Sequence, residues 1–94
     1  MITGKKKTTM KAVGITTASE ITAVEVHTLR YWEHEFETFL CPTRTRGGQR
    51  RYRPEDIQTV FLIKRLLRDE MFSIAGAKRY LQKANAEIEF RNAA

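Results

Sequence analysis

The sequence predicts a mainly α fold with four helices and a small two-stranded β-ribbon, on three observations. Apolar residues recur at helical spacing in segments near 25–36, 54–70 and 74–84. A hydroxyl residue followed three positions later by glutamate predicts the start of a further short helix near residue 17. Residues 44–53 contain five arginines around a Gly-Gly pair, and a chain reverses direction easily at such a pair.

Length and composition restrict the class of protein. The 94 residues are enough for one small domain. A single cysteine, Cys41, excludes a disulfide framework, argues against a structural zinc site and fits a reducing cytoplasm. The net charge of +6 favours a polyanionic partner, of which nucleic acid is the commonest. Because the sequence lacks an apolar run of membrane-spanning length and a secretory signal, we expect a cytoplasmic protein without a membrane partner.

Three segments are expected along the chain. Residues 1–12 are polar and basic without periodicity, which is typical of a flexible basic arm. Residues 13–84 hold the periodic segments and form the expected folded domain. Residues 85–94 form either a C-terminal tail or an extension of the last helix.

The first two helices are expected to be short and closely joined. The first begins at the capping box Thr17-Ala18-Ser19-Glu20, after an extended segment at Val13 and Ile15, and ends near residue 23. The second spans about 25–36, with an apolar stripe formed by Leu29, Trp32 and Phe36. Its opposite side carries hydrogen-bond donors, namely His27, Arg30, Tyr31 and His34. Two helices joined by about three residues, the second with a donor-rich outer face, predict a helix-turn-helix.

The remaining elements follow from local signals. Arg44-Thr45 and Arg50-Arg51-Tyr52 are the two expected arms of the ribbon. Pro54 fits the first position of the third helix, which runs to about Glu70, although arginine is a poor N-cap before it. Ser73 caps a fourth helix over about 74–84. The side chains expected to face inward from these two helices are Ile57, Val60, Phe61, Leu62, Ile63, Leu66, Leu67, Ile74, Ala77, Tyr80 and Leu81.

Four motifs in order resemble the DNA-binding domain of the MerR-type transcriptional regulators. They are Thr28-Leu29-Arg30-Tyr31-Trp32-Glu33, then Pro42 with Arg44-Thr45, Gly47-Gly48, Arg50 and Tyr52, then Asp56-Ile57, and last Phe72-Ser73-Ile74-Ala75-Gly76-Ala77. The resemblance covers about residues 13–83. It implies a winged helix-turn-helix, with the second helix in the major groove, the Gly-Gly wing beside it, and regulation of transcription from a two-fold symmetric operator.

The sequence departs from the family pattern at several positions. Ala23 stands where the family usually has glycine in the turn, and Glu25 where it usually has a capping serine. Arg46 and Arg51 stand where acidic and aliphatic residues are common, so this wing is more basic than usual. The family's long dimerisation helix and effector domain are not found within the 94 residues, which predicts either a fragment of a longer regulator or a compact relative.

The expected DNA contacts lie in the helix-turn-helix and in the wing. They are Thr17, His27, Thr28, Arg30, Tyr31, Arg44, Arg46, Gly47, Gly48, Arg50 and Arg51. Arg30 is the leading candidate for a base contact, since arginine binds guanine bidentately; a phosphate contact or an ion pair with Glu33 or His34 is the alternative. Tyr31 is expected to bind phosphate or to lie half-buried at the rim, and His27 to contact DNA or to be a plain surface residue.

The arginines of the wing are expected to differ in role. Side chains alternate along a ribbon, so Arg44 and Arg46 share a face whereas Arg50 and Arg51 do not. One or two of them should reach phosphate or the minor groove, with Arg50 ranked first because it matches the family's recurring arginine. Tyr52 is expected to fold back onto the core. A merely solvated basic loop is the alternative for the wing.

No catalytic or cofactor-binding pattern is found in the sequence. His27, His34 and Cys41 do not complete a tetrahedral metal site, and no nucleophile set or paired carboxylates stand out. We therefore expect no enzyme activity, no metal and no cofactor.

Three functions remain open: a sequence-specific regulator, an excisionase-like architectural factor in recombination, and a module that docks an acidic protein. Duplex DNA is the expected partner, joined in a full-length regulator by RNA polymerase. We expect a homodimer on DNA or in a longer chain, and a monomer or weak dimer in isolation.

Overall fold

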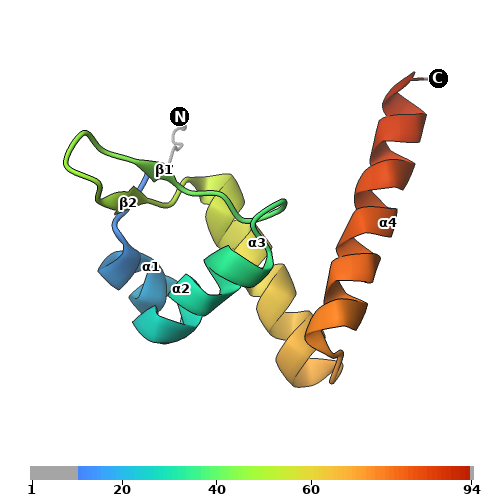
Figure 1. The fold of residues 1–94 in the computed structure, drawn as a ribbon, viewed down its shortest axis with the longest axis horizontal. Helices are drawn as coiled ribbons and strands as arrows, with labels where there is room; N and C mark the ends of the chain where they lie inside the picture. The colour runs from blue at the N-terminus through green and yellow to red at the C-terminus, as the bar shows by residue number, and fades with distance from the viewer. Residues whose placement is uncertain (1–10, 94) are drawn as a thin grey trace, which may run out of the picture. The chain divides into compact units, whose positions relative to one another are not determined.

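A computed structural model of the chain describes residues 11–93, with side chains up to Glu87. The elements are α1 (Ile15–Thr22), α2 (Val26–Glu35), β1 (Thr43–Arg44), β2 (Arg50–Arg51), α3 (Pro54–Lys64), a π-helical turn (Arg65–Asp69) and α4 (Ile74–Ala93), as Figure 1 shows. Within the described residues this confirms the mainly α class, with four α-helices and a two-stranded antiparallel ribbon. The basic arm expected over 1–12 lies outside the described residues up to residue 10.

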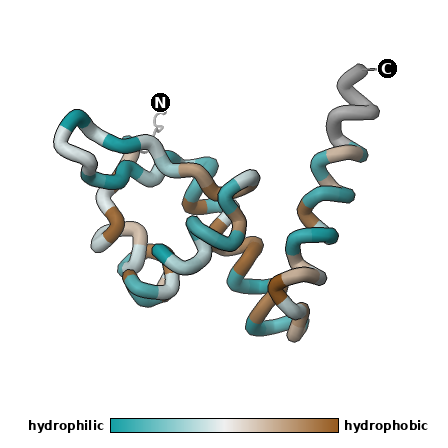
Figure 2. The backbone as a smooth tube through the Cα atoms, in the orientation of Figure 1, coloured by the Kyte–Doolittle hydropathy of each residue, from teal (hydrophilic) through white to brown (hydrophobic). Residues whose placement is uncertain are grey.

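The chain divides into two compact units, one up to Phe61 and one from Leu62 onward. The first holds α1, α2, the ribbon and most of α3, and the second holds the π-helical turn and α4. Figure 2 shows the ribbon as mostly hydrophilic, whereas hydrophobic and hydrophilic positions alternate along the helices.

Helix α1 begins earlier than the capping signature predicted. Ile15 is its first residue and Gly14 its N-cap, with no side-chain cap, so the expected capping box at Thr17 is wrong. The reason is a tertiary constraint: the backbone of Val13 exchanges two hydrogen bonds with Tyr52, at 2.9 and 2.6 Å. That bridge keeps Val13 extended and allows the helix to start two residues later. Ile15 is therefore helical, and the expected extended segment ends before it.

The turn between α1 and α2 contains the three residues Ala23, Val24 and Glu25. Ala23 adopts φ 59° and ψ 32°, in the left-handed region, and Val24 is fully buried. Left-handed backbone costs a residue with a Cβ roughly 1–2 kcal/mol. The geometry thus gives a physical reason for the family's usual glycine at this position.

Helix α2 matches its predicted extent, with Glu25 and Phe36 as its caps. Its predicted stripe is confirmed, because Leu29, Trp32 and Phe36 are all at most 3% exposed. Other buried hydrophobic side chains of this unit are Ala18, Val24, Leu40, Tyr52, Ile57 and Val60. The stripe therefore forms one side of the core of the unit and leaves the opposite side of α2 in solvent.

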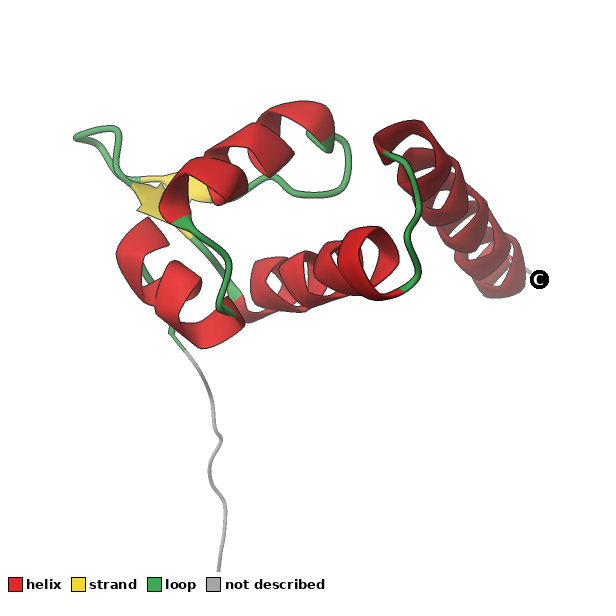
Figure 3. Ribbon diagram, turned by 90° about the horizontal axis from the view of Figure 1, so that it is seen from below, coloured by secondary structure: helices red, strands yellow, loops and turns green. Residues whose placement is uncertain are grey.

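The ribbon contains only two residue pairs, Thr43 with Arg51 and Arg44 with Arg50. Its first arm is thus one residue earlier than predicted, although the Thr45 N–H still donates to the Gln49 carbonyl at 2.8 Å. Gly48 has φ 87°, which only glycine adopts at little cost, so the predicted reversal at the Gly-Gly pair is confirmed. Figures 1 and 3 show the tip of the ribbon projecting beyond the helices of its unit.

Helix α3 begins at Pro54, as predicted, and its cap comes from inside the helix. The Asp56 carboxylate, 2% exposed, accepts the backbone N–H of Arg53 at 2.8 Å and also binds its guanidinium. The hydrogen bond between the Arg53 guanidinium and the Asp56 carboxylate raises the pKa of Arg53. The acid at the third helical position therefore replaces the side-chain cap that arginine cannot supply.

Two side chains that were predicted to face inward, one in α3 and one in α4, are exposed. Phe61 and Tyr80 are 45% and 41% exposed. Consecutive apolar residues at 60–63 point in all directions around a helix, so burial of Val60 leaves Phe61 outside. Tyr80 instead packs edge-on against Phe72, with ring centroids 5.8 Å apart.

Helix α4 has the longer of the two extents that the sequence left open. The Ser73 hydroxyl accepts the Gly76 N–H at 3.0 Å, which confirms the expected cap. The helix continues to Ala93, so residues 85–93 extend it rather than forming a separate tail.

Replacing Ala23 with glycine should stabilise the protein by about 0.5–1 kcal/mol, because relief of the left-handed strain exceeds the added entropy of the unfolded chain. Chemical denaturation at equilibrium measures the change. Glu20→Gly, at an exposed position of α1, is the control and should destabilise by a similar amount. A loss of stability in Ala23→Gly would contradict the assignment of strain to the turn.

Candidate nucleic-acid interface

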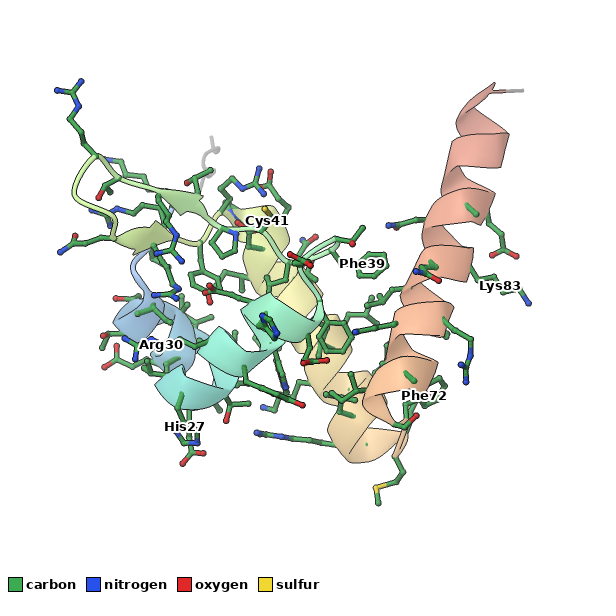
Figure 4. The ribbon with its side chains drawn as sticks, in the orientation of Figure 1. His27, Arg30, Phe39, Cys41, Phe72 and Lys83 are labelled. Atoms are coloured by element: carbon green, nitrogen blue, oxygen red, sulfur yellow. The ribbon has the colours of Figure 1, made fainter. Side chains whose placement is uncertain are left out.

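An open groove of about 400 Å³ separates α1, α2 and the ribbon within the first unit. Its lining consists of Gly14, Ile15, Thr16, Thr17, Arg30, Gly48, Gln49, Arg50 and Arg51. Five of the predicted contact residues, from three elements, therefore border one space. Figure 4 shows Arg30 on α2, at the side of the helix next to α1.

The first turn of α1 supplies backbone donors to this groove. The Ala18 N–H is bonded to the Gly14 carbonyl, so the N–H groups of residues 15–17 precede the first intrahelical bond. Gly14 brings no side chain to cap them. Such a helix start attracts anions, and Thr17, which is exposed, adds a hydroxyl to it.

Arg30 is exposed and makes no ion pair or hydrogen bond with any residue that the structure describes. The alternative of an ion pair with Glu33 or His34 is thus not observed. A guanidinium that is not engaged in the folded chain can bind a base edge or a phosphate without first breaking an internal contact.

The rest of the outer face of α2 lies outside the groove. His27 has a side chain 79% exposed and lies 3.5 Å from the Glu25 carboxylate, at the start of the helix (Figure 4). Tyr31 is 52% exposed and Thr28 is half-buried. These predicted residues share the solvent side of α2 with Arg30 but do not line the groove.

The four predicted arginines of the wing divide into two pairs. Arg46 and Arg51 are exposed, and their side chains bind no described residue. Arg44 donates to the Gly48 carbonyl at 3.0 Å and lies 4.0 Å from Glu33, while Arg50 binds Glu33 at 2.7 Å. The sequence ranking placed Arg50 first, yet the structure commits its guanidinium to an internal carboxylate.

Glu33 was expected only within the first family motif and as an alternative partner of Arg30, and its contact with the wing was not predicted from the sequence. Its carboxylate, 11% exposed, accepts hydrogen bonds from Arg50 and from the Tyr52 hydroxyl. The available signal was the alternation of a strand, which places Arg50 and Tyr52 on the same face. No sequence pattern indicated that α2 would face them.

Tyr52 is fully buried, which confirms that it folds back onto the core. Burial raises the pKa of its hydroxyl far above the ordinary value, and the hydrogen bond to Glu33 raises it further. The phenol therefore stays protonated and acts as a donor to the carboxylate across the ordinary pH range.

Residues 14–84 match the family model described as the MerR HTH family regulatory protein. The chain belongs to this family. It is also similar to a putative heat shock protein HspR from Streptomyces coelicolor, with 32% identity over 81 residues, which is 84% of this chain. The chain spans 52% of the length of that relative.

The family assignment confirms the MerR-type resemblance and makes the winged helix-turn-helix a DNA-binding module of transcription regulation. Among residues 11–93, no helix is long and apolar enough to span a membrane. In the same part of the chain, no three His, Cys, Asp or Glu residues lie close enough together to hold a metal ion.

The raised pKa of Tyr52 predicts a dependence of stability on pH. The folded chain keeps this proton where the unfolded chain, with a tyrosine pKa of about 10, loses it. The contribution of the Tyr52 hydroxyl to the free energy of unfolding is complete below about pH 10. Above that pH it declines by about 1.4 kcal/mol per pH unit.

Tyr52→Phe removes this group, so its free energy of unfolding should fall less steeply above pH 10 than that of the unaltered chain. Tyr31→Phe, at an exposed tyrosine, should keep the steep fall. Denaturant titrations between pH 8 and 11 measure both slopes, and equal slopes in the two variants would contradict the assignment.

Proposed function

We propose that this chain binds double-stranded DNA sequence-specifically to regulate transcription, with α2 in the major groove and the wing on phosphate or in the minor groove. The observation that carries the proposal is the groove shared by the start of α1, Arg30 and the wing. Backbone N–H groups and guanidinium groups from three elements face one space there. This is the combination that holds a nucleic-acid strand in register.

In this proposal α2 and the wing, which both carry hydrogen-bond donors, have different tasks. Arg30 and its neighbours His27, Thr28 and Tyr31 lie on the exposed side of α2, where a recognition helix contacts base edges and flanking phosphates. Arg46 and Arg51 extend from the wing and supply charge that does not depend on sequence. Base choice therefore rests with α2, and the wing increases affinity.

The groove also bears on the other two hypotheses. A module that docks an acidic protein has no need of backbone donors aligned with a recognition helix, so duplex DNA is the better fit. An excisionase-like factor would use the same surfaces and differs in the arrangement of its binding sites. Catalysis forms no part of the proposal. A homodimer on DNA and contact with RNA polymerase belong to it as features of a full-length regulator.

Selection of bound duplexes from a random pool tests the proposal. A regulator should select one motif with two-fold symmetry, and the spacing of its half-sites reports the geometry of the dimer. Direct repeats would favour the recombination function instead. Failure to bind any duplex at low salt would overturn both and leave the protein-docking function.

Arg30→Ala should cost roughly 1–3 kcal/mol of binding free energy on the selected site and much less on duplexes altered at one base pair. Arg30→Lys keeps the charge and should weaken the same base preference by a smaller amount, because the ammonium group lacks the planar fork of the guanidinium. Titration of fluorescent duplexes measures both variants. A loss that is equal on all sequences would show that Arg30 contacts only the backbone.

Arg46→Ala should reduce the slope of log K against log salt concentration by about one unit without changing sequence preference, since one phosphate contact is lost. Arg79→Ala, at an exposed position of α4, removes the same charge far from the wing in sequence and serves as the control. An equal change of slope in the two variants would show that only net charge matters.

A further inference from the structure

Three residues of the wing converge on the single carboxylate of Glu33 in α2. Arg50 donates to Oε1 at 2.7 Å, and the Arg44 guanidinium lies 4.0 Å from the same oxygen. The Tyr52 hydroxyl donates to Oε2. The side chain of Glu33 is 11% exposed, so the carboxylate is largely shielded from solvent, and each of its oxygens has a partner in the wing.

The register of the ribbon explains the convergence. Arg44 pairs directly with Arg50, and Tyr52 follows two positions after Arg50, so all three side chains share one face of the ribbon. Thr43 and Arg51 form the other pair and project from the opposite face. Glu33 thus occupies one face of the wing and leaves the other to solvent.

The ribbon is too short to hold its own orientation. It has two residue pairs, and an isolated two-stranded hairpin is at best marginally stable in water. The backbone bridge between Val13 and Tyr52 anchors one end of the second strand. The side-chain anchor to the recognition helix is Glu33, through Arg50 and Tyr52.

We propose that Glu33 is a positioning residue that fixes the wing relative to α2 and thereby determines which phosphates Arg46 and Arg51 reach. Arg50 then acts through Glu33 rather than as a direct DNA contact. The part of this inference that concerns DNA contacts rests on the proposed function. The part that concerns the orientation of the wing can be tested on the folded chain without DNA.

The first test uses the protein without DNA. Glu33→Gln keeps the size of the side chain and removes its charge, whereas Glu37→Gln removes a charge at an exposed position just after α2. Amide nitrogen relaxation should show increased mobility at residues 44–51 in Glu33→Gln and no change in Glu37→Gln. An equally rigid wing in both variants would overturn the proposal, whether or not the chain binds DNA.

The second test measures whether the wing still contributes on DNA. On a random-sequence 30-base-pair duplex at 0.1 M salt, Arg46→Ala should weaken binding of the unaltered chain roughly 5- to 10-fold, as expected for one phosphate contact. In the Glu33→Gln background the same substitution should weaken it less than about twofold, because a wing without its anchor no longer presents Arg46. Equal losses in the two backgrounds would overturn the proposal.

A further outcome separates positioning from charge neutralisation. If Glu33 only neutralised Arg50, Glu33→Gln would free that guanidinium for DNA. The variant would then bind DNA more tightly, and with a steeper salt dependence, than the Glu37→Gln control. That result would also overturn the proposal. If Glu33→Gln does not fold, Tyr52→Phe removes one of the two hydrogen bonds and keeps the Arg50 ion pair. Tyr52→Phe should also increase the mobility of residues 44–51 and reduce the effect of Arg46→Ala, both to a smaller extent. The absence of both changes would contradict the role of Glu33 as a positioning residue.

Discussion

The hydrogen bonds between the Glu33 carboxylate and the wing are the interaction on which the geometry of this domain depends. They join α2 to residues of the ribbon that lie 17 and 19 positions further along the chain. The apolar side of α2 is fixed by the core, and its polar side lies in solvent. Glu33 stands between these two sides, so one residue links the packing of the domain to the placement of its basic tip.

The same carboxylate organises the positive charge of the domain. Residues 44–53 include five arginines, whose positive charges would repel one another if none had an acidic or carbonyl partner. Glu33 engages Arg50 directly, Asp56 binds Arg53, and Arg44 bonds to the Gly48 carbonyl. Arg30, Arg46 and Arg51 stay without an internal partner among the described residues. Arg30 and Arg51 border the groove and Arg46 lies in the turn between the two strands, whereas Arg50 borders the groove while bound to Glu33.

Local signals predicted a large part of this fold and site. The stripe of α2, the start of α3 at Pro54 and the cap at Ser73 follow from spacing within a few residues, and each is confirmed. The predicted start of α1 was wrong because the backbone bridge between Val13 and Tyr52 overrides the capping motif. The bonds of Glu33 to Arg50 and Tyr52 were not predicted for a similar reason: these partners come from the ribbon, and no local pattern reveals which helix a ribbon will face.

An NMR titration of the labelled chain with the duplex selected from a random pool measures whether the bond between Arg50 and Glu33 persists while α2 and the wing bind DNA. We expect the changes in amide chemical shift to concentrate in residues 14–17, in 27–31 and in 44–51, and to saturate at the same DNA concentration. The Arg50 side-chain Nε–H resonance should keep the chemical shift that marks its bond to Glu33. Shifts concentrated in α4, or release of Arg50 from Glu33 on binding, would contradict this expectation.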